Sequence, residues 1–204
     1  MKFSILMMIA ATLTALAAEQ QAIPSSPSGP KEVAVIQTSE GDMVIQFWND
    51  AAPNTVENFK KLARAGFYNG TAFHRIMKGF MIQGGDPLTK DPSKEEQYGN
   101  GGPDYTIKAE FNQHKHERGV ISMAREEEPD TAGSQFFICL AAVPRLDGKY
   151  TSFGRLIKGD DVLTRIGDTP VTKNSAGENS KPTKRVVIRG VKIVSETGAA
   201  DNRE

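Results

Sequence analysis

The sequence predicts a mainly β fold, a closed or nearly closed antiparallel β structure with two helices. Short runs of β-branched and aromatic residues alternate with turn residues along most of the chain. Gly and Pro are frequent, at 19 and 11 of 204 residues, which favours many tight connections over a helical bundle. Two segments only have helical periodicity, and a chain of this length can bury one sizeable core.

The overall composition points to a neutral partner. Lys plus Arg and Asp plus Glu both number 25, so no net charge directs the protein to nucleic acid or to an anionic membrane. Cys139 is the single cysteine, so no internal disulfide can form. It lies in the apolar run 136–140, which predicts a buried and inert thiol.

The first residues have the pattern of a secretory signal. Lys2 precedes an apolar run over residues 3–18, and Ala15-Leu16-Ala17 offers the small residues that a signal peptidase prefers. We expect residues 1–17 to be a signal peptide. A membrane anchor is the alternative, but the run is short for a bilayer span of roughly 20 residues.

The rest of the chain divides into three segments. Residues 18–32 contain three spaced prolines among Gln, Ser and Gly, which predicts a disordered linker. Residues 33–194 carry the β-rich pattern and form the predicted folded domain. Residues 195–204 are a polar C-terminal tail without a Lys-Asp-Glu-Leu type retrieval signal.

Strands are predicted where β-branched and aromatic runs recur between turns. Two such runs flank the turn residues 39–42, which predicts a hairpin. The polar and Gly-rich stretch 87–103 predicts a loop, since no Lys-Ser/Thr pair and no helix start follow its glycines. The predicted strands are residues 33–38, 43–47, 105–109, 120–124, 134–140, 150–156 and 186–194.

Two helices complete the predicted domain. The first begins at Pro53, where a missing N–H costs nothing, and continues to about Ala65, with Gly66 as its C-terminal cap. Its apolar residues share one face, so it is expected to cover one end of the sheet or barrel. The second spans residues 160–166 and ends at Gly167.

The stretch Phe73–Asp86 concentrates aromatic, cationic and amide side chains between glycines. In a strand, Arg75 and Met77 would share a face, and past the Gly79 break Met81 and Gln83 would share it too. One exposed face would then carry a cation, an amide and apolar groups.

Together with the segment Gly133-Ser134-Gln135-Phe136-Phe137-Ile138, this stretch resembles the signature of cyclophilin-type peptidyl-prolyl isomerases. The resemblance extends over residues 33–194. It implies a closed eight-stranded antiparallel β-barrel capped by two helices, with a packed lumen and a substrate groove on the outer wall. It also implies an isomerase that uses no metal and no other cofactor.

The reaction needs no bond to be made or broken. Rotation about a peptide bond faces a barrier of roughly 18–20 kcal/mol because resonance stiffens the C–N bond. A catalyst must hold the proline ring and stabilise the twisted amide, whose nitrogen regains a lone pair. The guanidinium of Arg75 is a rigid, permanently charged donor that could serve this nitrogen without a proton exchange.

The resemblance implies a role for each of nine residues. Arg75 would donate to the proline nitrogen, and Gln83 and Phe80 complete the catalytic set. The expected substrate-binding residues are Met81, Ala124, Gln135, Phe137, Leu146 and Tyr150. Among the nine, Phe80, Met81, Phe137 and Leu146 would form the proline pocket, Gln83 and Gln135 would hold the substrate backbone, and Ala124 would pair with it.

Four positions depart from the usual pattern of the family. Arg145 stands where many members have a Trp that shapes the groove rim and helps to bind cyclosporin. Tyr150 stands where a His is usual, and keeps an aromatic wall with a polar tip. Arg125 replaces a common Asn and places a charge beside the bound peptide, and Lys78 replaces a Pro.

Other functions are weighed against this one. A barrel that grips proline-containing segments as a chaperone or scaffold, with weak catalysis, is the nearest alternative. A metal site at His114 and His116 is disfavoured because the surrounding residues are charged and no further ligand is near in sequence. Periodicity does not exclude a carrier protein with a hollow barrel, and only the two motifs at residues 73–86 and 133–138 argue against it. His74 is expected to be a core residue rather than a general base.

We therefore expect an exported peptidyl-prolyl cis-trans isomerase, periplasmic or secreted, that assists the folding of other exported proteins. Its partners would be proline-containing polypeptides. We expect no nucleic acid, no stable membrane association after signal cleavage, and a monomer.

Overall fold

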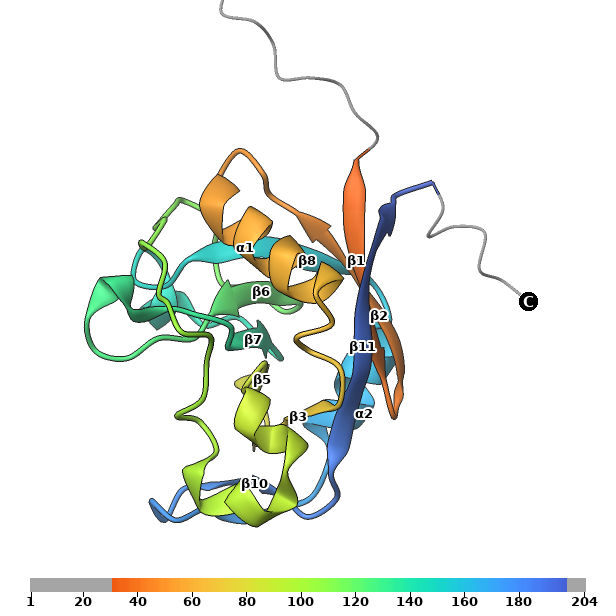
Figure 1. Ribbon diagram of the computed structural model, residues 1–204, viewed down its shortest axis with the longest axis vertical. Coiled ribbons are helices and arrows are strands. Elements are labelled where there is room, and N and C mark those ends of the chain that lie inside the picture. The colour runs from red at the N-terminus through yellow and green to blue at the C-terminus, as the bar shows by residue number, and fades with distance from the viewer. Residues whose placement is uncertain (1–30, 198–204) are drawn as a thin grey trace, which may run out of the picture.

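The computed structural model describes residues 31–197. The predicted signal peptide, most of the predicted linker and the end of the polar tail lie outside the described residues. Within the described part, an antiparallel sheet curls into a barrel with two α-helices packed against it (Figure 1). The predicted fold class is confirmed.

The main sheet of the described residues has nine strands in the spatial order β3-β11-β1-β2-β8-β6-β7-β5-β4. Their bounds are β1 (Glu32–Thr38), β2 (Gly41–Phe47), β3 (Thr71–Phe73), β4 (Arg75–Met77), β5 (Met81–Gly84), β6 (Val120–Met123), β7 (Phe136–Cys139), β8 (Ser152–Lys158) and β11 (Val186–Ser195). A separate hairpin is formed by β9 (Val171–Lys173) and β10 (Asn179–Pro182).

The barrel closes at His74. β3 and β4 lie at opposite ends of the strand order, yet His74 alone separates them in the chain. The backbone N–H of His74 donates to the carbonyl of Gln83 at 3.1 Å, which continues the pairing of β4 with β5. Residues 71–77 are therefore one bent strand that joins both edges, and counted as one it makes eight strands.

The interior is filled by side chains from opposite walls. Ile36, Ile45, Ile82, Ile138 and Phe153 are all fully buried and belong to one apolar cluster. Each lies on a strand whose neighbouring residues face the other way, because successive side chains alternate across a strand. The lumen is thus a packed core, and any binding surface built on these strands must lie on the outer wall.

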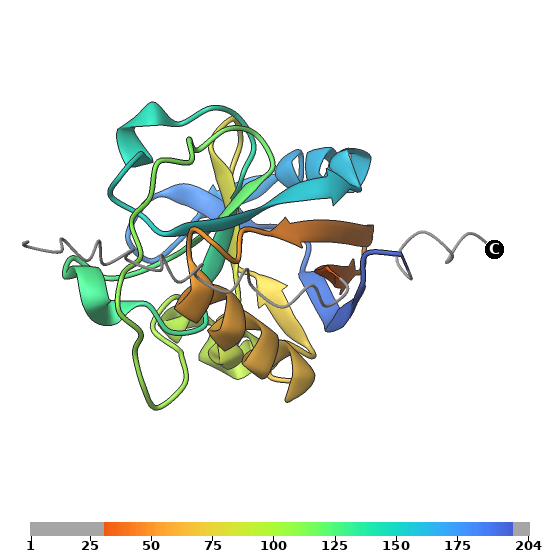
Figure 2. The ribbon, with the colours of Figure 1, turned by 90° about the horizontal axis from the view of Figure 1, so that it is seen from above.

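Two helices pack on opposite sides of the strands, as Figure 2 shows with α1 in orange and α2 in blue. α1 (Pro53–Arg64) begins at its proline and buries Val56, Phe59 and Leu62. Gly66 follows with a φ of 68°, a left-handed conformation that favours glycine at a helix end. α2 (Asp160–Gly167) buries Val162, Leu163 and Ile166. Both predicted helices are confirmed within a residue or two.

One predicted strand is wrong and one hairpin was not predicted. Residues 105–109 have the alternating exposure of an extended chain, but make only one bridge, Ile107 to Ala132. They run outside the barrel, where no strand lies beside them. Nothing in the polar sequence around β9 and β10 predicted their pairing. The predicted loop from residue 87 includes two 3-10 turns, η1 (Pro87–Lys90) and η2 (Pro92–Gln97).

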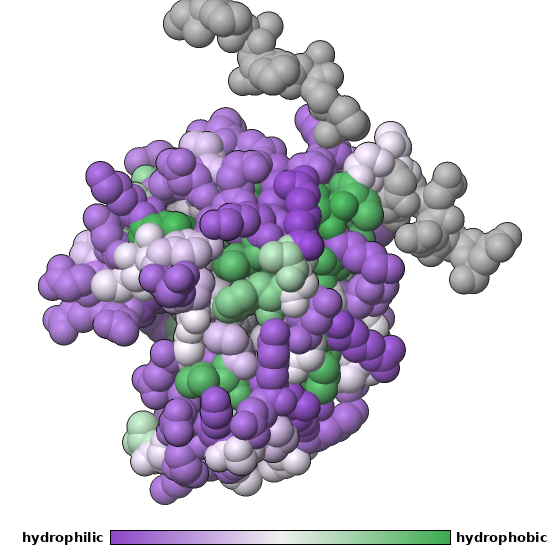
Figure 3. All heavy atoms as spheres, in the orientation of Figure 1, coloured by the Kyte–Doolittle hydropathy of each residue, from purple (hydrophilic) through white to green (hydrophobic). Residues whose placement is uncertain are grey.

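The surface agrees with the balanced composition. Hydrophilic side chains cover most of the face in Figure 3, and apolar residues appear there as small separate patches. No helix within residues 31–197 combines the length and the apolar character that crossing a bilayer requires.

Candidate functional site

A small pocket of about 120 Å³ opens on the outer wall of the barrel. Its lining combines apolar side chains with two arginines and an amide. The residues are Arg75, Phe80, Met81, Gln83, Ala124, Arg125, Phe137, Leu146 and Tyr150, and together they are called the outer-wall pocket below. Of the nine predicted site residues, all except Gln135 line it, and Arg125 is the one addition.

Strand register brings these side chains to one face. In the antiparallel pair β4–β5, Arg75 lies opposite Gln83 and Met77 lies opposite Met81. Ile76 and Ile82, between them, are fully buried in the core, so their neighbours must face outward. β5 also pairs with β7, where Gln83 lies opposite Phe137. The alternation predicted from the sequence is therefore the outer face of the wall.

The floor of the pocket is a second apolar cluster, separate from the core. Met81, Phe137, Cys139, Val143 and Leu146 are buried in it, and Phe80, Ala124 and Tyr150 pack against it. η4 (Pro144–Leu146) supplies Leu146, and Phe137 and Tyr150 meet edge to face with ring centroids 5.8 Å apart. Burial raises the pKa of the Cys139 thiol to about 12, so the predicted inert cysteine is confirmed as a buried thiol.

The guanidinium of Arg75 is held from several sides. Its Nε and Nη2 donate to the two carboxylate oxygens of Glu178 at 2.7 and 2.8 Å. Nη1 donates to Oε1 of Gln83 at 3.2 Å, and Nη2 also lies 3.2 Å from the sulfur of Met77. The Arg75 guanidinium lowers the pKa of Glu178 to about 2, so this carboxylate is ionised at neutral pH.

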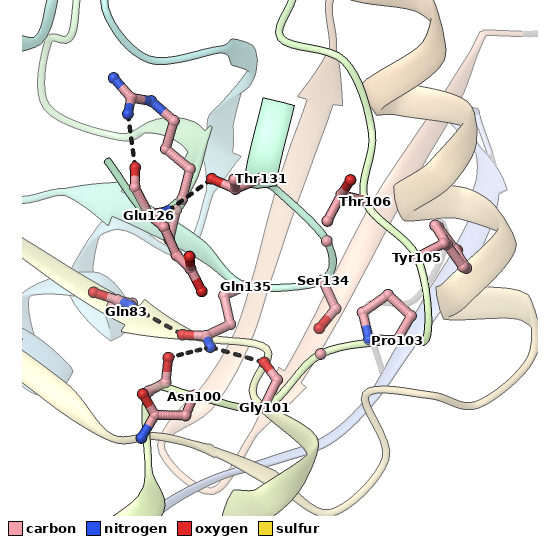
Figure 4. Close-up of a pocket in the computed structure, with 15 residues that line it drawn as sticks. Gln83, Asn100, Gly101, Pro103, Tyr105, Thr106, Glu126, Thr131, Ser134 and Gln135 are labelled. Atoms are coloured by element: carbon pink, nitrogen blue, oxygen red, sulfur yellow. Dashed lines mark hydrogen bonds between the residues drawn. The ribbon is translucent and has the colours of Figure 1, made fainter. Parts of the chain in front are cut away.

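An amide chain links Arg75 to a neighbouring pocket. Nε2 of Gln83 donates to Oε1 of Gln135 at 3.0 Å, and Nε2 of Gln135 donates to the carbonyls of Gly99 and Gly101, both at 2.8 Å (Figure 4). This second pocket, of about 220 Å³, is lined by the Gly-rich loop, Thr106 and Glu126. Gln135 thus joins the site through Gln83 rather than by lining the outer-wall pocket.

Two further arginines stand at the rim. The guanidinium of Arg145 lies over the ring of Phe80, 4.4 Å from its centroid. That of Arg125 lies 4.7 Å from the centroid of Tyr150 and donates to the carbonyls of Lys149 and Glu126. Arg125 therefore ties two loops together, whereas Arg145 is an exposed cation that covers an aromatic wall of the pocket.

The histidines occupy separate environments. Burial lowers the pKa of His74 to about 4, so its ring is neutral at pH 7 and is not the imidazolium that a histidine general acid requires. The Nδ1 and Nε2 atoms of His116 lie 3.1 Å from Asp147 Oδ1 and Ser122 Oγ, and its ring stacks on Phe137 beneath the pocket. The ring of His114 stacks on Trp48 instead, at 3.8 Å.

Sequence reasoning missed two parts of the site. Glu178 lies 103 residues from its partner Arg75 in a polar turn that has no motif. The carbonyls of Gly99 and Gly101 accept from Gln135, although their loop was predicted only as irregular. Backbone carbonyls have no sequence signal of their own, so only the fold could place them.

Comparison with known families finds one that covers most of the domain. The family model described as "Cyclophilin type peptidyl-prolyl cis-trans isomerase/CLD" matches residues 33–193. The chain is 43% identical over 137 residues to a peptidyl-prolyl cis-trans isomerase of Helicobacter pylori, covering 65% of this chain and 79% of that one. It is 36% identical over 159 residues to a probable peptidyl-prolyl cis-trans isomerase of Brucella abortus, covering 76% and 81%.

A longer relative and a solved structure show the same likeness. Peptidyl-prolyl cis-trans isomerase-like 2 of Cryptococcus neoformans is 39% identical over 167 residues, which are 81% of this chain but only 28% of that protein's length. The crystal structure of a Cryptosporidium parvum cyclophilin-type isomerase, determined in the presence of the dipeptide Ala-Pro, superposes with a TM-score of 0.71 at 34% identity. That alignment covers 80% of this chain and 99% of that one.

Proposed function

This chain belongs to the cyclophilin-type peptidyl-prolyl cis-trans isomerase family, and from that premise we propose that its outer-wall pocket binds proline and that Arg75 catalyses rotation of the preceding peptide bond. One observation carries the assignment. A guanidinium stands at the edge of a small apolar pocket, held in place by Gln83 on the facing strand. A pyrrolidine ring has no donor and suits such walls.

Catalysis in this proposal is electrostatic and geometric. Rotation breaks the resonance of the amide and returns a lone pair to the proline nitrogen. The apolar floor of Met81, Phe137 and Leu146 holds the ring still while the acyl part of the bond turns. Arg75 then donates a hydrogen bond to the nitrogen, which is a better acceptor in the twisted state than in the planar one.

The amides hold the substrate chain across the pocket. The N–H of Ala124 already donates to the carbonyl of Gln135 at 2.9 Å, so a bound peptide would pair with the carbonyl of Ala124. The amide of Gln83 accepts from Arg75 and donates to Gln135, so it lies between these two side chains, where the substrate backbone would pass. The peptide on the acyl side of proline would extend from the outer-wall pocket toward the second pocket.

The cellular role rests on the sequence alone. The signal-like pattern at residues 1–17 supports an exported isomerase, periplasmic or secreted, that speeds proline-limited folding of other exported proteins. Because X-Pro isomerisation takes tens to hundreds of seconds uncatalysed, such folding steps would gain from an isomerase. We propose that it works as a monomer on proline-containing polypeptides.

The test compares isomerisation of a short X-Pro peptide by the wild-type chain and by Arg75→Ala. Turnover is measured by NMR exchange between the cis and trans peptide, and binding by titration in the same samples. We expect the substitution to lower turnover by at least about 10²-fold while the peptide still binds. Binding without acceleration by the wild-type chain would instead favour the proline-binding chaperone or scaffold.

A further inference from the structure

We propose that Glu178 is a positioning residue that orients the Arg75 guanidinium toward the proline nitrogen. This inference rests on the role proposed for Arg75. Glu178 does not line the outer-wall pocket, so it has no place among the residues that touch the substrate. It acts through Arg75, from the hairpin of β9 and β10, which forms a separate two-stranded sheet beside β4.

The contact is bidentate and directional. Both carboxylate oxygens of Glu178 accept from Arg75, one from Nε at 2.7 Å and one from Nη2 at 2.8 Å. This fork-to-fork arrangement fixes the plane of the guanidinium as well as its position, which a single hydrogen bond cannot do. The two side chains are each about 32% exposed, so the pair is only partly screened by water.

Four of the five N–H donors of the Arg75 guanidinium are already used, and one remains for the substrate. Glu178 takes one donor of Nε and one of Nη2, and the sulfur of Met77 takes the other on Nη2. Gln83 takes one donor of Nη1. The second N–H of Nη1 is left without an acceptor among these contacts. Nη1 is the nitrogen that contacts Gln83, and Gln83 and Arg75 both line the outer-wall pocket. The carboxylate thus occupies the edge formed by Nε and Nη2 and leaves a donor on Nη1, the nitrogen that contacts Gln83.

The backbone of Glu178 is itself fixed. Its N–H donates to Oδ1 of Asn174 and its carbonyl accepts from the N–H of Asn174, both at 2.9 Å. Nδ2 of Asn174 donates to Oγ of Ser180, which is 1% exposed. Gly177 completes the turn with a φ of 79°, a conformation that glycine adopts without strain. The turn therefore holds the backbone of Glu178 in place, from which its side chain reaches Arg75.

Orientation has a direct kinetic consequence. An unpaired Arg side chain has several rotamers of similar energy, and only some aim a donor at the pocket. Holding the productive one in advance lowers the barrier without strengthening ground-state binding. A carboxylate that instead drew the cation away from the substrate would slow the reaction, and its removal would then raise turnover.

The same hairpin offers a matched control. Lys181 on β10 forms an ion pair of 2.7 Å with Glu95 on η2, a contact that does not involve Arg75. Glu95→Gln removes one carboxylate from the hairpin's anchoring, as Glu178→Gln does, but leaves the bidentate pair in place. An effect due only to a looser hairpin would follow from both substitutions.

The experiment measures turnover of an X-Pro peptide by NMR exchange, and peptide binding by titration, for the wild-type chain, Glu178→Ala, Glu178→Gln and Glu95→Gln. Arg75→Ala and the double variant Arg75→Ala/Glu178→Ala complete the cycle. We expect Glu178→Ala to lower turnover roughly tenfold with the dissociation constant changed less than about twofold. Glu178→Gln, which keeps one acceptor, should lose less, and Glu95→Gln should match the wild type.

A spectroscopic readout follows the guanidinium itself. The Nε–H signal of Arg75, identified by its loss in Arg75→Ala, should exchange slowly with water in the wild type and in Glu95→Gln, and quickly in Glu178→Ala. The inference is overturned if Glu178→Ala leaves turnover unchanged or raises it, or if Glu95→Gln lowers it as much. If Arg75→Ala itself keeps the wild-type rate, the proposed function fails together with the inference. If Arg75→Ala is inactive while Glu178→Ala keeps the wild-type rate, the proposed function stands and only the positioning role of Glu178 fails.

Discussion

Arg75 and Gln83 face each other across the antiparallel pair of β4 and β5, and Nη1 of Arg75 donates to Oε1 of Gln83 at 3.2 Å. The position of both side chains follows from the register, because a slip of one residue would turn them into the core in place of Ile76 and Ile82. The cation and the amide are therefore placed by the same packing that closes the barrel wall.

Replacing Arg75 by Lys tests whether charge alone is sufficient. Lysine keeps the charge but has no planar fork, so it cannot bind Glu178 in two places and reach Gln83 as well. We expect turnover of an X-Pro peptide to fall by about 10²-fold, with peptide binding retained. Thermal unfolding serves as the control for folding. A lysine variant within threefold of the wild-type rate would contradict the need for the fork.

Replacing Gln83 by Leu breaks the chain from Arg75 to Gln135 while keeping a side chain of similar size. Arg75 loses an acceptor and Gln135 loses a donor. We expect turnover to fall roughly tenfold and peptide binding to weaken, because Gln83 is proposed to act on both. Gln113→Leu is the matched control, since Gln113 is exposed and lies outside the outer-wall pocket. Equal losses in the two variants would refute the role of Gln83.

Replacing Arg145 by Trp tests the rim of the pocket. The Arg145 guanidinium lies over Phe80, so an apolar ligand must displace or desolvate a cation to reach that ring. An indole offers a broad apolar surface and one donor at the same position. We expect the wild type to be poorly inhibited by cyclosporin and Arg145→Trp to be inhibited at least tenfold more strongly. Lys192→Trp, on the exposed side of β11, should leave inhibition as in the wild type.

The neutral state of His74 makes stability depend on pH. Its pKa is about 4 in the folded chain because burial disfavours the cation, against 6.5 for an exposed histidine. Between these values only the unfolded chain binds the proton, so the free energy of unfolding falls as pH is lowered from about 6.5 to 4, by up to about 1.4 kcal/mol per pH unit. Above pH 6.5 this contribution is fully present.

This dependence is checked by urea unfolding of the wild type and of His74→Phe at several pH values between 7.5 and 5. The variant should show a shallower loss of stability over that range. Burial also lowers the pKa of His116, so a part of the slope should remain in His74→Phe. Identical slopes for both proteins would show that His74 titrates normally.

Local pattern was enough for much of the fold and for one face of the candidate site, whereas the other site residues were implied by the family resemblance. Alternation placed Arg75, Met81 and Gln83 on one face, and the helix beginning at Pro53 followed from its proline and apolar stripe. These features depend on neighbours a few residues away, which the sequence displays directly. The strand predicted at residues 105–109 is wrong, because this extended segment makes a single bridge to Ala132 instead of joining the sheet.

By itself, the sequence determined the outward face that carries Arg75, Met77, Met81 and Gln83, because a period of two on a half-buried strand decides which side chains face outward. Only the tertiary structure decided what holds Arg75 in place. Glu178 reaches it across 103 residues, and Gln135 is tied to the carbonyls of Gly99 and Gly101. Such contacts join segments distant in the chain, and no local periodicity records them, because they exist only once the barrel has closed and the hairpin of β9 and β10 lies beside β4.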